Sequence, residues 1–224
     1  MIYILTQRAL KLGSVAVVKV RRHLLAERLP APQLYYFGYG ANLDLKRFQR
    51  YKMNVVLVGV AKLEKHALKF NFPCEYLGKG YASVEVDPAK EVWGMLYRID
   101  QPSLFLLDVM EWAVMNQYRR TLERVTTKEG KVVEAFVYKA KYPREGLFPS
   151  AVYKNLILKA AKEHGFPKEY LAQIEGVESR DSFALDPGFS FIRPNRRRLL
   201  ERYLKKPYLW HDRLREILAD KLRF

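Results

Sequence analysis

Cysteine and histidine are scarce in this 224-residue sequence, and their placement excludes several kinds of site. Cys74 is the only cysteine, so no intramolecular disulfide can form, and it is better explained as a small buried hydrophobic side chain than as a reactive thiol. The histidines are scattered without metal-ligand spacing: His23, His66, His164 and His211. We therefore predict no metal and no Cys–His nucleophile pair, and we expect an intracellular protein.

Nucleotide-binding and membrane-spanning motifs are also missing. No Gly-x-x-x-x-Gly-Lys-Ser/Thr phosphate loop is present, and Gly38-x-Gly40 lacks the third glycine and the βαβ setting of a dinucleotide site. Arg8, Lys11 and Lys19 interrupt the apolar N-terminal run before it reaches the ~18 residues of a membrane span. A convincing signal cleavage site is absent, and a single serine in residues 1–33 argues against a transit peptide. We expect a cytoplasmic protein with no cofactor and no membrane span.

Positive charge is concentrated outside the middle of the chain. The formal net charge is +16, of which residues 1–33 contribute +5 (six basic, one acidic) and residues 180–224 contribute +6 (twelve basic, six acidic). With 49% hydrophobic residues, the chain can bury one good core with appendages. We predict a basic N-terminal extension over 1–33, a central domain over 34–179 and a basic helical extension over 180–224.

The last segment has a pattern with more than one interpretation. Arg193 and Arg196 to Arg198 precede apolar residues that recur at helical spacing, which predicts two amphipathic helices. Their apolar faces could pack on the domain or on a second subunit, as in a homodimer, and we favour this interpretation. Nucleic-acid binding by the arginines is less favoured because no recognised nucleic-acid module accompanies them. A membrane-surface or acidic partner is the remaining alternative.

Hydrophobic patterning predicts an α+β fold with mostly adjacent strands. Strands are expected over 34–39, 55–63, 66–72, 81–86, 92–99, 117–126 and 131–139. Helices are expected over 43–50, 102–110, 150–164 and 167–174. Lys128-Glu129-Gly130 is typical of a hairpin turn, and Gly165 is expected to end the third helix. Because the strands are neighbours along the chain, an antiparallel or mixed sheet is favoured over a βαβ sheet.

A glycine-rich loop follows the first expected strand. Tyr36 to Leu43 runs from an aromatic strand into Gly38 and Gly40, whose freedom at positive φ could let successive N–H groups converge on an anion or oxyanion. Asn42 could then cap the following helix. Short glycine loops are more often simple tight turns, so the loop alone does not identify a site.

An acidic residue occupies the apolar face of the second expected helix. Asp100 is a plausible N-cap, with Pro102 in the first turn. Glu111 lies four residues after Leu107 and seven after Leu104, so it should point inward with them. Partial burial would raise a carboxyl pKa toward the range of a general base that later acts as an acid. Alternatively, Glu111 sits at a frayed helix end and pairs with Arg119 or Arg120.

Together these segments resemble the γ-glutamylcyclotransferases. Tyr39-Gly40-Ala41-Asn42 matches three positions of the family's Tyr-Gly-Ser-Asn loop, and Leu107 to Glu111 is similar to the Leu-Asp-x-x-Glu that ends in its catalytic glutamate. Further similarity lies in Gly80 to Val84, Val92-Trp93-Gly94 and Tyr118-Arg119, and in the helical residues Pro149-Ser150, Tyr153, Ala160-Ala161, Gly165 to Pro167 and Tyr170. The resemblance covers about residues 35–176. It implies a small mixed or antiparallel β-barrel with flanking helices.

The resemblance also implies a metal-independent reaction and a set of site residues. A γ-glutamyl amide would cyclise to 5-oxoproline and release an amine, with Glu111 as the acid and base. Tyr39, Gly40, Ala41 and Asn42 would form the substrate loop, and Tyr118 would help to line the pocket.

Two departures from the family pattern affect this expectation. Ala41 replaces the loop serine, and Trp112 replaces a glycine that commonly follows the glutamate. The first removes a hydroxyl, and the second could reshape the side of the pocket that holds the leaving amine. The sequence does not name that amine. The alternative function is a weakly catalytic or non-catalytic binding module that holds nucleic acid through its basic termini.

Overall fold

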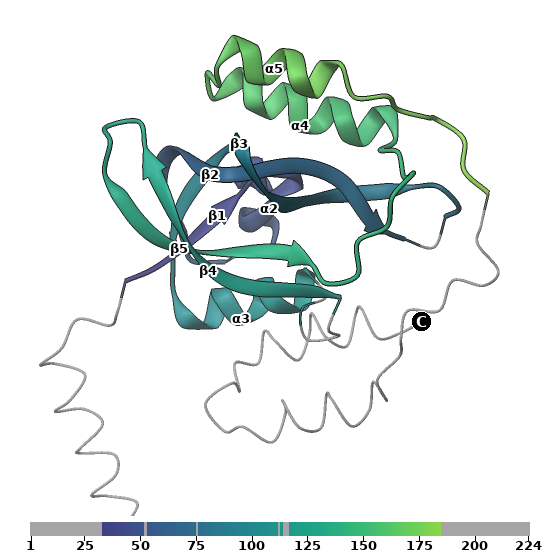
Figure 1. The fold of residues 1–224 in the computed structure, drawn as a ribbon. Coiled ribbons are helices and arrows are strands. Elements are labelled where there is room, and N and C mark those ends of the chain that lie inside the picture. Colours follow the sequence, from purple (N-terminus) through teal and green to yellow (C-terminus); the bar gives the residue numbers. More distant parts are fainter. Residues whose placement is uncertain (1–32, 52, 75, 112, 114–116, 185–224) are drawn as a thin grey trace, which may run out of the picture. The chain divides into compact units, whose positions relative to one another are not determined.

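The computed structural model describes residues 33–51, 53–74, 76–111, 113 and 117–184. The chain divides into two compact units, Met1–Gln33 and Leu34–Phe224, and nearly all described residues belong to the second. Figure 1 shows that second unit as a barrel with helices on two sides. The predicted arginine cluster and amphipathic helices of the C-terminal extension, and residues 1–32 of the N-terminal one, lie outside the described residues.

A closed barrel forms the centre of the described fold. Its strands are β1 (Leu34–Gly38), β2 (Val55–Pro73), β3 (Gly80–Ile99), β4 (Tyr118–Thr127) and β5 (Val132–Ala140), arranged in the order β1-β3-β2-β4-β5. All neighbouring pairs are antiparallel except β1 and β5, which meet in parallel register at Tyr36 and Phe136 and close the barrel. The predicted mixed β-barrel with flanking helices is therefore confirmed.

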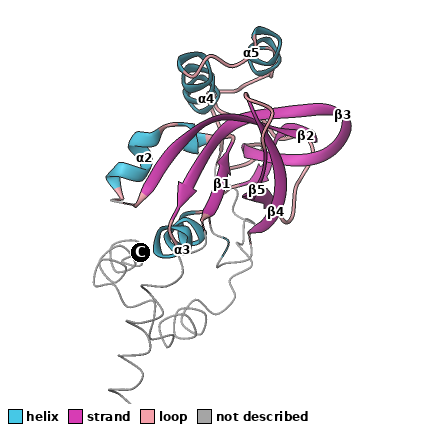
Figure 2. Ribbon diagram, turned by 90° about the vertical axis from the view of Figure 1, so that its left-hand side faces the viewer, coloured by secondary structure: helices cyan, strands magenta, loops and turns pink. Residues whose placement is uncertain are grey.

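Helices cover opposite sides of this barrel. The loop after β1 holds the short 3-10 helix η1 (Ala41–Leu43) and α2 (Leu45–Arg50). Helix α3 (Gln101–Met110) lies on one side, and the pair α4 (Ala151–Glu163) and α5 (Lys168–Glu175) lies on the other, as Figures 1 and 2 both show. His164 Nε2, at the end of α4, lies 3.1 Å from the Leu43 carbonyl oxygen and ties this pair to η1.

Two long strands replace four predicted ones. The sequence pattern predicted breaks near residues 64–65 and 87–91, but β2 and β3 each continue through them. Between the pairs Glu64–Glu91 and His66–Val86, β2 contributes the single residue Lys65 and β3 contributes residues 87–90. Lys65 has a φ of 58°, and the register shifts at this point without ending the ladder, as at a β-bulge.

Close packing inside the barrel explains the Val-Trp-Gly segment of β3. A Cβ atom at Gly94 would lie 2.5 Å from the Gly38 carbonyl oxygen and 2.5 Å from the Phe37 ring. No side chain fits there, so β1 can cross β3 closely only because residue 94 is glycine. Apolar side chains fill the space around this contact, and Phe37, Val92 and Leu96 are fully buried.

Three local predictions are confirmed. Asp100 caps α3, because its side chain accepts a hydrogen bond from the Ser103 N–H at 2.8 Å. The β4–β5 hairpin turns at residues 128–130, where Gly130 has a φ of 80°. Gly165 follows the end of α4 with a φ of 65°, as a C-terminal glycine should.

Candidate functional site

The loop after β1 forms one wall of a cavity of about 400 Å³. Neither Gly38 nor Gly40 has a positive φ, so the expectation that their conformational freedom shapes the loop is wrong. Space is the physical reason for glycine at position 40, because a Cβ there would lie 3.2 Å from Ala82 Cβ and 3.3 Å from the Tyr153 hydroxyl. Gly40 thus lets the loop lie against β3 and α4.

A single 3-10 turn leaves backbone donors at this loop. The Leu43 N–H donates to the Gly40 carbonyl at 3.1 Å and closes the turn. The N–H groups of Ala41 and Asn42 precede it and have no acceptor within the turn. The Tyr97 hydroxyl, on β3, shares its hydrogen between the carbonyl oxygens of Asn42 and Leu43, at 2.9 and 3.2 Å. These bonds hold the loop against the barrel. The loop can therefore present two adjacent N–H groups in a fixed orientation.

Asn42 joins this loop to the predicted glutamate. It does not cap the following helix, since Asp44 does so through the Lys46 N–H at 2.9 Å. The Asn42 amide nitrogen instead donates to the Tyr36 hydroxyl at 2.7 Å and to Glu111 Oε1 at 2.6 Å. Both hydrogens of that nitrogen are used, and the side chain is 4% exposed. The capping prediction failed because the partner of Asn42 lies far away in the sequence.

Glu111 ends α3 and faces inward as its spacing predicted. Its backbone N–H donates to the Leu107 carbonyl at 2.8 Å, and Leu104 and Leu107 on the same face are buried. The carboxylate reaches Asn42 and lines the cavity. No ion pair between Glu111 and Arg119 or Arg120 is found among the described residues, and Arg120 pairs with Asp108. Trp112, which follows Glu111, lies outside the described residues.

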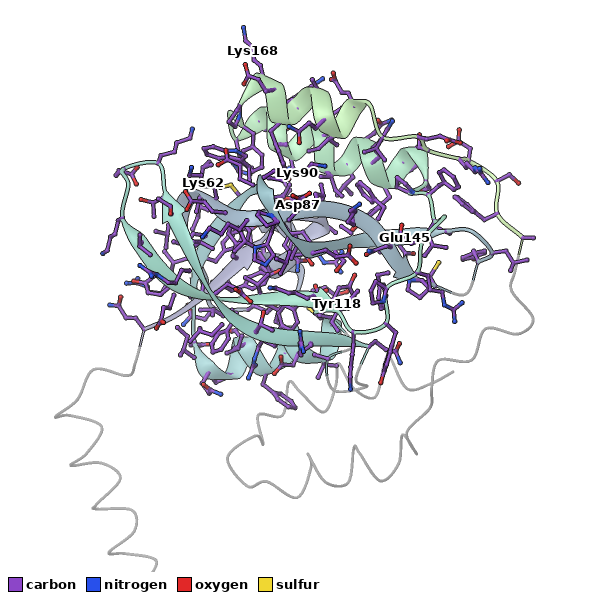
Figure 3. The ribbon with its side chains drawn as sticks, viewed as in Figure 1. Lys62, Asp87, Lys90, Tyr118, Glu145 and Lys168 are labelled. Carbon is purple, nitrogen blue, oxygen red and sulfur yellow. The ribbon has the colours of Figure 1, made fainter. Side chains whose placement is uncertain are left out.

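Six tyrosines surround the remaining space. All predicted site residues line the cavity, together with others that sequence reasoning did not assign to the site: Tyr36, Arg47, Phe72, Cys74, Tyr81, Ala82, Met110, Tyr138, Tyr153 and Leu156. Figure 3 shows Tyr118 among the side chains of the interior, whereas Lys168 at the start of α5 points away from the barrel. The cavity is thus rich in aromatic side chains, and its charged lining residues are Arg47 and Glu111.

The tyrosine hydroxyls are oriented by backbone groups. Tyr39 donates to the Tyr138 carbonyl, and Tyr118 donates to the Ala82 carbonyl at 2.8 Å. The Tyr153 hydroxyl lies 3.4 Å from the Ala82 N–H, which donates to it. Burial raises the pKa of Tyr39, Tyr118 and Tyr153, and nearby groups, including Glu111, raise these pKa values further. The phenols are therefore neutral hydrogen-bonding groups at physiological pH.

A second network holds the outer side of this aromatic wall. The Tyr138 hydroxyl donates to Asp108 Oδ1 at 2.7 Å, and Arg120 pairs with the other carboxylate oxygen. Burial raises the pKa of the Asp108 carboxyl, while its bonds to Tyr138 and Arg120 act in the opposite direction. Asp108 thus links α3 to β4 and β5 and fixes Tyr138 at the cavity.

The missed residues carried weak sequence signals. Tyr153 lies in the helical segment that resembled the family, but nothing in its spacing distinguishes a pocket residue from a core residue. Arg47 follows the buried Leu43 by four positions, which could have indicated an inward-facing cation. Tyr36 and Tyr138 belong to strands that meet only when the barrel closes, so their proximity depends on the tertiary fold.

The described residues also bear on metal binding and on membrane insertion. Within the described part of the chain, no group of three or more His, Cys, Asp or Glu side chains is arranged to hold a metal ion. None of the helices described there combines the length and apolarity needed to cross a bilayer.

Comparisons with known proteins bear on this site. The bovine (Bos taurus) γ-glutamylcyclotransferase is 32% identical over 151 residues, which cover 65% of this chain and 79% of the bovine protein. The human (Homo sapiens) γ-glutamylcyclotransferase is 31% identical over 154 residues, with the same coverage of each chain. This chain belongs to the γ-glutamylcyclotransferase family. The identification agrees with the resemblance found in the loop and helix motifs.

Two further comparisons support membership in this family. A family model described as the AIG2-like family matches residues 91–174, a range that includes Glu111, Tyr118 and Tyr153. A solved structure of a γ-glutamyl cyclotransferase has a TM-score of 0.61 at 29% identity, and the match covers 67% of this chain and 90% of that one. The barrel and its flanking helices are therefore the fold of the family.

Proposed function

We propose that this protein converts γ-glutamyl amides into 5-oxoproline and a free amine. In this reaction the substrate's own α-amino group attacks its γ-carbonyl carbon, a five-membered lactam forms, and the bond to the leaving nitrogen breaks. On becoming the lactam N–H the α-ammonium nitrogen loses two protons, and the leaving nitrogen gains both when it departs as an ammonium ion. No covalent enzyme intermediate is needed, so one acid/base group and a fitted cavity suffice.

One observation carries the proposal: the Glu111 carboxylate lies within 2.6 Å of Asn42, inside the cavity and next to the glycine loop. In the proposed mechanism Glu111 removes the ammonium proton and then delivers a proton to the departing nitrogen. Asn42 keeps the carboxylate oriented toward the cavity. A base beside a loop with available N–H groups is the arrangement that acyl transfer requires.

The loop backbone takes the second role. As the ring closes, negative charge develops on the γ-carbonyl oxygen, and the N–H groups of Ala41 and Asn42 are available to receive it. Because these donors belong to the backbone, replacement of the family serine by Ala41 leaves them in place. Gly40 contributes by letting the loop approach Ala82 and Tyr153 closely.

The tyrosine rings give the cavity its shape and exclude water from it. Cyclisation requires a folded substrate whose nitrogen lies near the γ-carbon, and an extended chain in water seldom has this geometry. Tyr39 and Tyr118 have their hydroxyls occupied by backbone carbonyls, so their rings are rigid walls. A cavity of about 400 Å³ lies within the range of small-molecule sites and has room for a γ-glutamyl group and part of the amine.

The remaining expectations about partners stay predictions. The nucleic-acid alternative depends on Arg193 and Arg196 to Arg198, which lie outside the described residues, and no observation in the described part favours it. The homodimer, the cytoplasmic location and the boundaries 1–33, 34–179 and 180–224 are retained as parts of the proposal. Gel filtration of the full chain tests the homodimer. A DNA or RNA binding assay at increasing salt concentration tests the nucleic-acid alternative.

A substrate panel tests the proposed function. The full chain is incubated with γ-glutamyl dipeptides, glutathione and a γ-glutamyl-lysine isopeptide, and 5-oxoproline is measured by mass spectrometry against enzyme-free controls. We expect time-dependent 5-oxoproline from at least one compound, matched by the free amine. If no γ-glutamyl compound yields 5-oxoproline from folded protein, the proposal is wrong.

A further inference from the structure

Arg47 is the one basic residue among the residues that line the cavity, and Glu111 is the one acidic residue. Arg47 lies in α2, directly after the glycine loop. Its Nε atom is buried and has no hydrogen-bond partner among the described residues. No salt bridge found in the described part of the chain involves Arg47. The cavity thus holds a guanidinium group whose buried nitrogen the protein leaves unsatisfied.

The charge of Arg47 acts on groups inside the cavity. Burial raises the pKa of the Tyr36 phenol, Glu111 raises it further, and Arg47 acts in the opposite direction. The same opposing influence of Arg47 acts on the pKa of Tyr153, which burial raises. Both tyrosines line the cavity together with Arg47. The positive charge of Arg47 therefore acts on groups of the cavity wall.

An unpaired buried donor is costly, so a site that keeps one is expected to satisfy it with a ligand. Leaving a buried donor of a charged group without a partner costs about 1–3 kcal/mol or more. An arginine is suited to one class of ligand in particular, because its planar donors match the two oxygens of a carboxylate. A γ-glutamyl group carries a carboxylate and an ammonium on the same α-carbon. The cavity offers one side chain of each charge, Arg47 and Glu111.

We propose that Arg47 binds the α-carboxylate of the γ-glutamyl group and thereby selects for it, an inference that rests on the proposed function. Glu111 then faces the ammonium on the same carbon, and the remaining arm of the substrate folds toward the Ala41 and Asn42 N–H groups. Anchoring the carboxylate fixes the position of the attacking nitrogen. Arg47 is thus a specificity residue that contacts the substrate without taking part in proton transfer.

A matched pair of substrates isolates this contact. A 4-aminobutanoyl amide carries the same nucleophile and the same amide as a γ-glutamyl amide and closes to the same ring size, giving 2-pyrrolidinone. It lacks only the α-carboxylate. If Arg47 binds that group, replacing Arg47 must harm the γ-glutamyl substrate and spare its analogue. A role for Arg47 in tuning Glu111 or in folding would affect both substrates alike.

The experiment compares Arg47→Gln, Arg47→Lys and wild type. Lys46→Gln is the control, because Lys46 is the exposed neighbour of Arg47 in the same helix. The kcat/KM values are measured for the γ-glutamyl amide that the panel identifies and for the 4-aminobutanoyl amide of the same amine. Binding of 5-oxoproline and of 2-pyrrolidinone is measured by calorimetry, and thermal unfolding checks that each variant is folded.

We expect Arg47→Gln to lower kcat/KM for the γ-glutamyl substrate and the affinity for 5-oxoproline by about 10- to 100-fold, as loss of a charged hydrogen bond does. The analogue and 2-pyrrolidinone should change by less than about threefold, within the scatter of an uninvolved site. Arg47→Lys should recover part of the loss, because it restores the charge without the planar donors. Lys46→Gln should behave as wild type.

Other outcomes overturn specific parts of the account. Equal losses for both substrates, or no loss in folded Arg47→Gln, contradict the carboxylate contact. If wild type binds 5-oxoproline through Arg47 but turns over no amide, the contact stands and the catalytic proposal fails. If wild-type protein binds neither 5-oxoproline nor 2-pyrrolidinone and forms no lactam from any amide, both the carboxylate contact and the catalytic proposal fail.

Discussion

The barrel interior and the wall of the cavity differ in the groups they bury. In the interior, Val92, Val125 and Val137 are completely buried among other apolar side chains. At the cavity, the buried groups include Asn42, with an unsatisfied Oδ1, and Arg47, with an unsatisfied Nε. Buried polar groups without partners destabilise a fold, so the cavity wall retains polarity at the expense of stability. We therefore expect substitutions at the cavity to affect chemistry more than folding, and substitutions in the apolar interior to do the reverse.

The largest expected difference between the two regions comes from Glu111→Gln. Glutamine keeps the shape and can still accept from Asn42, but it cannot exchange a proton. Loss of general acid/base catalysis should lower 5-oxoproline formation by about 10²- to 10⁴-fold. The melting temperature should stay close to that of wild type, because no apolar contact is lost. Steady-state kinetics and thermal unfolding check both statements. Turnover within a few-fold of wild type would remove Glu111 from the mechanism.

Gly40→Val should lower activity by displacing the loop that forms one wall of the cavity. A Cβ at this position already approaches Ala82 and Tyr153 to 3.2 and 3.3 Å, and the extra methyl groups of valine would push the loop away. A displacement of about 1 Å in a catalytic group costs about 10²-fold in rate, so kcat should fall by that order. Ala41→Ser, which restores the family residue, is the matched loop control and should stay near wild type. A fully active, folded Gly40→Val protein would show that the loop backbone does not act in catalysis.

Gly94→Ala should break the interior instead. The added methyl would lie 2.5 Å from the Gly38 carbonyl oxygen and from the Phe37 ring, so β1 and β3 must separate. Overpacking of this kind typically destabilises by about 1–3 kcal/mol. Urea denaturation measures this change in the free energy of unfolding. Folded Gly94→Ala protein should keep more activity than Glu111→Gln. An unchanged denaturation midpoint would mean that the strands adjust without strain.

The smallest expected effect lies outside both regions, at an ion pair on the barrel surface. Burial raises the pKa of Glu123, but its hydrogen bonds to Lys139 and Thr121 outweigh burial, and the pKa is lowered from 4.5. A lowered carboxyl pKa stabilises the fold above pH 4.5, and this contribution is lost as the pH falls through the lowered value. Glu123→Gln should therefore lower stability by about 0.2–1 kcal/mol at neutral pH.

The pH dependence distinguishes this pair from a packing effect. Melting temperatures of wild type and Glu123→Gln should converge when the pH falls well below 4.5, because the wild-type carboxyl is then protonated. A difference that persists at low pH would come from packing and not from the charge of Glu123.

Much of the fold could be predicted from the sequence because its signals are local. The Asp100 cap, the Gly165 helix end and the hairpin at residues 128–130 each depend on a few neighbouring residues. The inward direction of Glu111 followed from its spacing to Leu104 and Leu107. The breaks predicted in β2 and β3 were wrong because a register shift interrupts the strand pattern locally without ending the ladder.

The site was harder to predict because its contacts are distant in sequence. Asn42 was expected to cap a helix, but its amide bonds to Tyr36 and to Glu111, which lies 69 residues away. Gly40 was expected to adopt a positive φ, but what excludes a side chain there is the proximity of Ala82 and Tyr153. Arg47 was missed because a charged residue in a short helix is usually solvated. Such contacts exist only once the barrel has closed.

Turnover in ¹⁸O-labelled water tests the central claim most directly, because it distinguishes intramolecular cyclisation from hydrolysis. Wild-type protein and the reactive γ-glutamyl amide are incubated in this water, and the products are analysed by mass spectrometry. The account predicts unlabelled 5-oxoproline and an equal amount of free amine, since the substrate's own nitrogen attacks the carbonyl. Glutamate that carries ¹⁸O as the main product would mean that water is the nucleophile, and it would contradict the account.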